Sequence, residues 1–276
     1  MPDFSYLRTA RPARKIQPPL PKMSRIFLIF LLSAALPAFA SPVTSFVPPT
    51  ASPVTSALPP SGRDIVKKMH DRYAGKWYHS FTFTQTTQVY RNDSLRSTQT
   101  WHEFIRLPDR FRMDFGPADS GNAVIFRGDS AYRFRSFQLK STSISNNEGL
   151  IFLLGGMFFY SFDQVCHILS DSLHFDLTAA REDNWQGHPV YVVGKEGSNQ
   201  LWIDQQNLCP LRMIKTDDKM DARFDDWQPF AGGFSETKCA FYINGKLAQT
   251  ETYHDCKANI PLEDKIFDPS QLNRSW

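Results

Sequence analysis

The sequence lacks the short patterns that usually mark a catalytic or metal-binding site. It contains no P-loop, no GxGxxG and no CxxC. His102-Glu103 begins like the HExxH helix of zinc proteases, but Arg106 stands where the second histidine is needed. The stretch around Ser130 lacks the second glycine of a nucleophile elbow, and the seven histidines are scattered without ligand spacing. We therefore predict no catalytic residue, no metal and no cofactor.

A strong charge of one sign is also missing once the N-terminus is set aside. Of the 31 basic and 28 acidic residues, residues 1–40 hold six basic and one acidic, so the remainder has 25 and 27. The remainder contains no cluster of Lys and Arg. A protein that binds nucleic acid is expected to keep a basic face. We therefore expect no nucleic-acid partner.

Long apolar runs are scarce, and the first one is followed by a cleavage signal. From Met23 the chain reads MSRIFLIFLLSAALPAFA, which has the basic start, apolar run and small-x-small ending of a secretory signal peptide. We expect residues 1–40 to be a leader cleaved near Ala40, with Met23 as an alternative start. Residues 41–61 repeat SPVTS and are rich in Pro, Ser and Thr, which predicts an extended linker. One folded domain, residues 62–276, follows.

A second apolar block, LIFLLGGMFFYSF, occupies residues 150–162. It is too short to cross a bilayer, which takes about 20 apolar residues. Two interpretations stay open: a buried core helix, or a mobile lid over an apolar cavity. Gly155 and Gly156 divide the block, and glycine is costly inside a helix but tolerates unusual backbone angles, so we expect a hinge there. The predicted lid residues are Leu150, Leu153, Leu154, Phe158 and Phe159.

The folded domain begins with a helix and continues mainly as strands. Ile65, Val66, Met69 and Tyr73 have helical spacing, and Gly75 is a natural stop. Alternating segments separated by short turns then predict strands at residues 79–90, 97–107, 110–115, 122–128 and 130–137. Further strand signals run through residues 172–256, and the chain is expected to end in coil. Because a sheet of about ten strands tends to curl, we predict an α+β fold. It is a strongly curved antiparallel sheet, an incomplete β-barrel of about ten to eleven strands, covered by helices on its concave side.

One face of this sheet is rich in large apolar side chains. Residues two apart in a strand share a face. By this period the following residues fall on one side: Phe81, Phe83, Trp101, Ile105, Leu107, Phe111, Met113 and Phe115. A thinly covered aromatic concavity favours a binding site for an apolar ligand. The alternative is a core that these side chains fill.

The cysteines allow more than one state. In an exported protein, four cysteines can form two disulfide bonds in three different ways. The four cysteines are Cys166, Cys209, Cys239 and Cys256. Asn244-Gly245 predicts a two-residue hairpin loop that sets Cys239 opposite Thr250, roughly 20 Å short of Cys256. We expect this pair not to form. Other disulfides and free buried thiols both stay open.

Several segments share their order and spacing with a known family. They are HSFTFTQ (79–85), FIRLPDRFRM (104–113), IFRGDSAYRF (125–134), LWID (201–204) and PLR (210–212). The first three are similar to the xxFTQ strand, the W-V-K-R-P-x-x-F strand pair and the glycine-aromatic hairpin of the LolA-like outer-membrane lipoprotein-sorting carriers. The resemblance covers most of residues 62–272. It implies a periplasmic, non-catalytic monomer whose half-barrel shields lipoprotein acyl chains between an inner-membrane donor and an outer-membrane acceptor.

One position departs from the family pattern. The family arginine before the proline, which is linked to lid closure, aligns with Leu107, while Arg106 takes the preceding lysine position. Neighbouring side chains in a strand point to opposite faces, so Arg106 cannot replace the missing arginine. Two cargoes stay open, a lipoprotein acyl chain or a related lipid. Apolar burial favours either one without a polar latch, since each buried CH₂ contributes about 0.8 kcal/mol.

Three functions stay open from the sequence. The first is the acyl-chain carrier, which a continuous apolar concavity beneath residues 150–162 would favour. The second is a non-catalytic cell-envelope module that binds another protein, which a filled core and an exposed apolar patch would favour. The third is a hydrolase with a dispersed site, which requires a histidine bonded to Ser or Asp inside a cleft.

Overall fold

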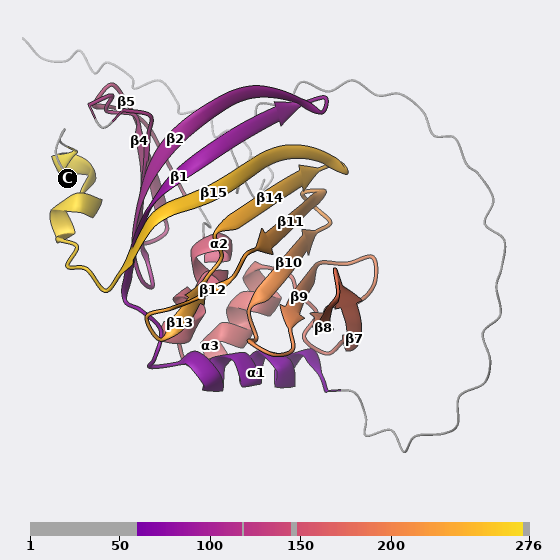
Figure 1. Ribbon diagram of the computed structural model, residues 1–276. Coiled ribbons are helices and arrows are strands. Elements are labelled where there is room, and N and C mark those ends of the chain that lie inside the picture. The colour runs from indigo at the N-terminus through magenta and orange to yellow at the C-terminus, as the bar shows by residue number, and fades with distance from the viewer. Residues whose placement is uncertain (1–59, 118, 145–147, 273–276) are drawn as a thin grey trace, which may run out of the picture.

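The computed structural model describes residues 60–117, 119–144 and 148–272 (Figure 1). The predicted leader and nearly all of the linker, residues 1–59, lie outside the described residues, as do residues 118, 145–147 and 273–276. Within the described part, no helix is long and apolar enough to span a membrane.

The domain opens with helix α1, Gly62–Tyr73, as the sequence predicts. The Ser61 hydroxyl accepts a hydrogen bond from the Asp64 backbone N–H (3.2 Å), and the Asp64 carboxylate accepts one from the Ser61 N–H (3.1 Å). This reciprocal capping box satisfies two donors at the start of the helix. The residues buried on the inner side of α1 include those with the predicted helical spacing: Ile65, Val66, Met69 and Tyr73.

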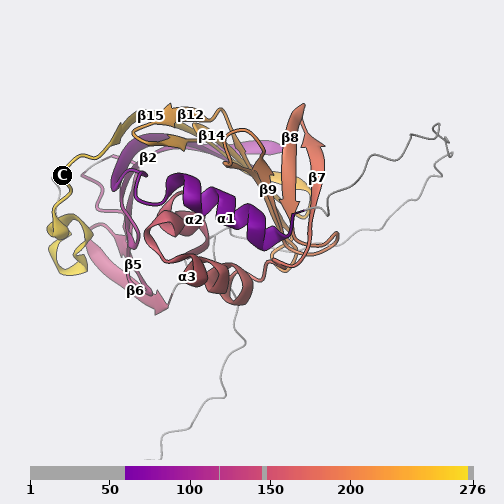
Figure 2. The same ribbon diagram turned by 90° about the horizontal axis from the view of Figure 1, so that it is seen from below.

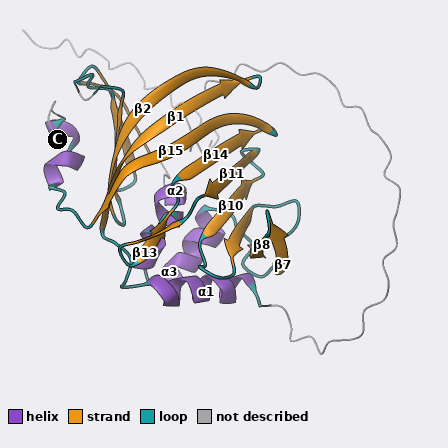
Figure 3. Cartoon of the chain, viewed as in Figure 1, coloured by secondary structure: helices purple, strands orange, loops and turns teal. Residues whose placement is uncertain are grey.

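Thirteen strands form one antiparallel sheet (Figures 1 and 3). They are β1 (Ser80–Arg91), β2 (Ser94–Arg106), β3 (Arg110–Phe115), β4 (Ala123–Arg127), β5 (Ser130–Arg135), β6 (Gln138–Ile144), β7 (Ala180–Trp185), β8 (His188–Val193), β9 (Gln200–Asp204), β10 (Pro210–Lys215), β11 (Met220–Asp225), β14 (Lys238–Ile243) and β15 (Lys246–Ala258). The order is β6-β5-β4-β3-β2-β1-β15-β14-β11-β10-β9-β8-β7. The sheet therefore has two edges, β6 and β7, and does not close into a barrel. Its long strands β1, β2 and β15 arch in Figure 1.

Short helices interrupt the strands between β6 and β7. They are α2 (Glu148–Leu153), η1 (Gly156–Phe159), α3 (Phe162–His167) and the π-helical turn η2 (Ile168–Ser172). Seen from below in Figure 2, α1, α2 and α3 lie between the end of the sheet that holds β5 and β6 and the end that holds β7 and β8. A separate two-stranded sheet, β12 (Gln228–Phe230) with β13 (Gly233–Ser235), follows β11.

Apolar side chains cluster on both faces of the sheet. The main cluster joins Ile65 of α1, Phe152 of α2 and Val165 of α3 to Phe81 of β1 and other strand residues. A second cluster lies around Phe104, whose side chain must point away from that of its neighbour Ile105. Its buried members are Phe104, Ala123, Ile125, Phe134 and Phe267. The C-terminal segment supplies Phe267 from the 3-10 helix η3 (Asp264–Phe267), and η4 (Pro269–Gln271) follows.

Some predictions about the sheet are wrong. The main sheet has thirteen strands rather than ten or eleven. The unforeseen edge strand β6 has exposed side chains along its whole length, so it carries no apolar alternation. Residues 173–179 alternate apolar and polar residues but form a loop, because Leu173 and Phe175 pack into the main cluster. The described part of the C-terminal segment contains the 3-10 helices η3 and η4, where coil was predicted.

The hairpin at Asn244-Gly245 forms as predicted, with both residues at positive φ. Its register differs by one residue, because the pairing shifts between Phe241 and Tyr242, and Cys239 lies opposite Glu251 rather than Thr250. All four cysteines are free thiols.

Candidate ligand-binding site

The strand register places the predicted apolar residues on one face. Phe81 lies opposite Ile105, and Ile105 opposite Phe111, while Trp101 lies opposite Phe115. Directly opposite residues of an antiparallel pair project to the same side, as do residues two apart along a strand. All seven predicted residues that belong to β1, β2 and β3 therefore share a face. The eighth, Leu107, follows the end of β2.

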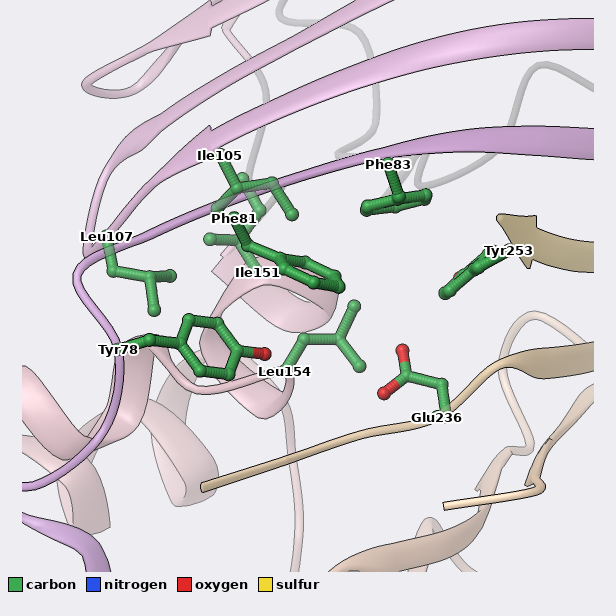
Figure 4. Close-up of a pocket in the computed structure, with 9 residues that line it drawn as sticks. All are labelled: Tyr78, Phe81, Phe83, Ile105, Leu107, Ile151, Leu154, Glu236 and Tyr253. Atoms are coloured by element: carbon green, nitrogen blue, oxygen red, sulfur yellow. The ribbon is translucent and has the colours of Figure 1, made fainter. Parts of the chain in front are cut away.

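A pocket opens on this face beside α2 (Figure 4). Five of its lining residues are predicted site residues: Phe81, Phe83, Ile105 and Leu107 from the sheet side, and Leu154 from the lid block. Sequence reasoning missed the other four, which are Tyr78, Ile151, Glu236 and Tyr253. None of the nine is a histidine, serine or cysteine. The pocket lining therefore contains no Ser–His or Cys–His pair.

The other predicted cavity residues lie farther along the same face. The Phe111 ring stacks on Phe126 with centroids 5.7 Å apart. Trp101 packs edge-on against Phe115 at 4.8 Å, and the partly buried Met113 packs against the main cluster. These four residues are not among those that line the pocket. The structure thus divides the predicted set into a pocket-lining half and a packed half.

The predicted lid residues take different positions. Leu154 lines the pocket, and Leu153 is buried in the main cluster. Phe158 faces the end of α1 instead, with its ring 4.7 Å from Trp77 and 5.2 Å from Tyr73. Phe159 lies edge-on to His79 at 5.2 Å. The side chain of Leu150 lies outside the described residues.

The two glycines mark the break between α2 and η1. Gly155 has φ +129°, and a Cβ atom at this position would overlap the indole of Trp77. Such a φ strongly favours glycine. Gly156 begins η1, and a Cβ there would lie 2.9 Å from the Ile151 carbonyl oxygen. Close packing and an unusual backbone angle thus account for both glycines, and the hinge stays a prediction.

The pocket is nearly filled by the side chains around it. Its empty volume is about 330 Å³ when the open space at its mouth is included, but the enclosed part has room for only about one water molecule. Among the described residues, this pocket therefore does not form the continuous concavity that would favour a carrier. A chain-like ligand would need Ile151 and Leu154 to move away from the sheet.

The departure at position 107 has a clear structural counterpart. Leu107 is buried and lines the pocket. Arg106 points the other way, donates a hydrogen bond to the Leu262 carbonyl oxygen (3.0 Å) and pairs with Asp264. The Arg106 guanidinium therefore holds the C-terminal segment against the face of the sheet opposite the pocket, which we call the outer face. Arg106 points to this face because neighbouring side chains in a strand alternate in direction.

Three buried glutamates lie on or next to the pocket face. Glu236, which follows β13, lines the pocket, and Figure 4 shows its carboxylate directed inward. Glu103 is opposite both Phe83 and Met113, and Glu251 is opposite Thr87. A sequence signal for Glu103 existed, since period 2 places it between Trp101 and Ile105 on the apolar face.

Burial dominates the ionisation of these carboxyls. It raises the pKa of Glu236 to about 8 and that of Glu251 to about 7. Burial also raises the pKa of Glu103, and the negative charges of Glu251 and Glu236 raise it further. Glu251 accepts hydrogen bonds from Gln249 (2.6 Å) and Tyr253 (3.0 Å), which lower its pKa against the effect of burial.

Two solved structures align with most of this chain. A domain assigned to outer-membrane lipoprotein sorting, from Vibrio parahaemolyticus, aligns with TM-score 0.56 and 12% identity over 76% of this chain and 97% of that one. The chain has a LolA-like fold. A DUF1329 family protein from Desulfovibrio piger aligns with TM-score 0.57 and 16% identity over 77% of this chain and 98% of that one. The sequence itself matches no protein-family model and no curated protein. At these identities the alignments confirm the expected LolA-like fold and leave the cargo open.

Proposed function

We propose that the protein is a periplasmic carrier that shields the acyl chain of a lipoprotein, or of a related lipid, in the pocket between β1, β2 and α2. The observation that carries this proposal is the pocket itself, because eight of its nine lining residues have aromatic or aliphatic side chains, and only Glu236 is a carboxylic acid. The LolA-like fold and the predicted signal peptide support the same function. In this proposal α2 and η1 cover the concave side of the sheet and form the lid.

Burial of an acyl chain is energetically sufficient for such a role. Each methylene removed from water contributes about 0.8 kcal/mol. Ten buried methylenes therefore give roughly 8 kcal/mol, which corresponds to a micromolar dissociation constant. Opening the lid subtracts from this gain, because Ile151 and Leu154 then lose their contacts with the sheet.

A pocket-filling substitution tests the function without introducing a polar group into the core. Leu154→Trp places a larger side chain in the pocket, whereas Leu139→Trp changes a leucine that is 52% exposed on β6. Binding of the neutral apolar dye Nile red, and its displacement by a diacylated lipopeptide, gives the readout. We expect Leu154→Trp to weaken both about tenfold or more, equivalent to about 1.4 kcal/mol, and Leu139→Trp to bind like the parent. Equal binding by all three proteins would refute the pocket, provided that both variants melt cooperatively.

The second candidate is a module that binds another envelope protein through its sheet edge. The edge strand β6 is exposed along its length, and it includes the apolar residues Leu139 (52% exposed) and Ile144 (82% exposed). An unprotected edge strand can pair with a strand of another chain. A proline at Ser141 blocks such pairing without touching the pocket, so loss of a partner in Ser141→Pro with normal dye binding would favour this candidate.

A further inference from the structure

We propose that the pocket binds amphiphiles whose apolar chain ends in a cationic amine, and that the carboxylate of Glu236 is the contact for that amine. This inference rests on the proposed acyl-chain pocket and names the chemical class of its ligand. Glu103 and Glu251 add two further acidic side chains to the same face.

Glu236 is placed as a ligand contact and not as a structural ion-pair partner. Glu236 is 4% exposed, and its carboxylate points into the pocket beside Leu154 and Tyr78 (Figure 4). Its own backbone N–H donates a hydrogen bond to this carboxylate. Within the described residues, no other side chain donates a hydrogen bond to it, and no basic side chain forms an ion pair with it. Buried polar groups nearly always have partners. A carboxylate left in this state at a cavity wall indicates that its partner comes from outside the chain.

The neighbouring glutamates show the same deficit of positive charge. Glu103 is 5% exposed and Glu251 is 7% exposed. Glu251 receives its hydrogen bonds from the neutral donors Gln249 and Tyr253. Across residues 60–117, 119–144 and 148–272, no ion pair joins any of the three glutamates to Lys, Arg or His. Burial raises the pKa of all three carboxyls, so the ionised form of Glu236 gains most from a cation that enters the pocket.

The remaining walls of the pocket also suit an ammonium group. Four aromatic rings line it in sequence: the Tyr78 and Phe81 centroids lie 5.2 Å apart, those of Phe81 and Phe83 5.0 Å, and those of Phe83 and Tyr253 4.3 Å. Aromatic faces attract cations, most strongly where water is excluded. A carboxylate beside aromatic walls thus favours an amine over a carboxylic acid, which the glutamates would repel.

A divalent metal fits this site less well. The described residues contain no group of three His, Cys, Asp or Glu side chains arranged to hold a metal ion. Metal sites need several such ligands around one point. A single inward carboxylate with aromatic walls matches a monovalent organic cation.

Three twelve-carbon ligands separate the amine preference from chain binding. Dodecylamine, dodecanol and dodecanoate, each below its aggregation threshold, compete with Nile red at pH 8.5, where the amine is charged. We expect dodecylamine to bind about tenfold or more tighter than dodecanol, because charge-assisted contacts exceed neutral ones by at least about 1.4 kcal/mol. Dodecanoate should bind most weakly.

Glu236→Gln tests the residue itself. It keeps the shape of the side chain and removes its charge, so dodecylamine and dodecanol should bind this variant with equal affinity. Glu182→Gln, an exposed position on β7, serves as the matched control and should keep the preference. If dodecylamine and dodecanol bind equally to the parent, or if Glu236→Gln keeps the preference, the inference fails and the acyl-chain pocket stands. If none of the three ligands binds, the proposed function fails as well.

Discussion

The two faces of β2 and β3 bury charged groups in opposite ways. On the outer face, the Arg112 guanidinium donates to both carboxylate oxygens of Asp114 (3.0 and 3.1 Å) and to the Ile266 carbonyl oxygen (3.1 Å). On the inner face, Glu103 lies between apolar neighbours without a basic partner among the described residues. One strand pair therefore carries a buried ion pair on one side and, on the other, a buried carboxyl whose pKa is raised by burial.

The covers of the two faces differ in the same way. The C-terminal segment closes the outer face with Phe267, which is fully buried, and fixes itself there through Arg106 and Arg112. The inner face beside α2 is closed by Ile151 and Leu154. Apolar contact is non-directional and needs no fixed partner geometry. The comparison indicates that directional contacts fix the cover of the outer face, whereas apolar contacts close the inner face beside α2. Displacement of that apolar cover by a ligand is part of the proposed function.

The largest expected effect comes from breaking the outer ion pair. Arg112→Leu leaves Asp114 buried without its partner, and losing one member of a buried pair costs about 3–5 kcal/mol. Urea denaturation gives the free energy of unfolding. Lys67→Leu, which breaks the exposed pair with Asp71 at 2.7 Å, should cost less than about 1 kcal/mol. Similar losses in the two variants would contradict the structural role of the outer face.

The inner carboxyl should act on stability through pH. The pKa of Glu236 is raised from 4.5 to about 8, so the folded state favours the protonated form. This stability is fully present below pH 4.5 and is lost as pH rises toward 8. The ionisable groups coupled to Glu236 are Glu103, Glu251, Tyr78, Tyr253, Cys209, Cys239 and Cys256.

Glu236→Gln should remove this dependence. Between pH 5.5 and 8.5 we expect the parent to lose about 3 kcal/mol more than the variant, since one pKa unit corresponds to about 1.4 kcal/mol. Urea denaturation at both pH values provides the measurement. Parallel losses in the two proteins would show that Glu236 has an ordinary pKa and is accessible to water.

A smaller effect is expected at the break in the inner cover. In Gly155→Ala, the alanine would have to adopt a φ of +129°, and its Cβ would overlap Trp77. We therefore expect the free energy of unfolding to fall by about 2 kcal/mol or more. Gly75→Ala is the matched control, because φ is also positive (+73°) but no atom lies within 4 Å of the added Cβ. Its cost should stay near 1 kcal/mol, which is about the cost of a left-handed conformation. If the control costs as much as Gly155→Ala, the contact with Trp77 is unimportant.

The smallest expected effect concerns the hydrogen bond from Tyr253 to Glu251 on the inner face. Tyr253→Phe removes a hydrogen bond of 3.0 Å to Glu251, which should cost about 1 kcal/mol. The pKa of Glu251 should rise further, because that hydrogen bond favours its ionised form. Carbon-13 NMR of the labelled carboxyl follows the titration. An unchanged titration midpoint would show that Tyr253 does not stabilise the carboxylate.

The sequence predicted those parts of the fold that depend on local period. Helix α1 and the shared face of Phe81, Ile105 and Phe111 follow from spacing alone, because side-chain direction repeats every 3.6 or 2 residues. The edge strand β6 was not predicted, because exposed positions need no apolar alternation. Residues 173–179 were wrongly predicted as a strand, because Leu173 and Phe175 have the spacing of a strand but lie in a loop.

The site was harder to predict than the face on which it lies. Half of the predicted cavity residues pack against each other instead of lining the pocket, since period 2 gives a direction but not a distance along the sheet. Glu236 was not predicted as a site residue, because it follows β13 and is far from β1 in sequence. Only the fold places it beside Phe81 and Phe83. Long-range placement of this kind has no local sequence signal.

Photoaffinity labelling with a fatty amine that carries a diazirine near the end of its chain tests the central claim most directly. Irradiation followed by peptide mass spectrometry identifies the residues that the chain touches. The account predicts adducts on peptides from β1, β2 and α2, especially at Phe81, Ile105 and Ile151, that unlabelled dodecylamine suppresses. Adducts confined to the outer face around Phe104 and Phe267, or adducts that no competitor suppresses, would contradict it.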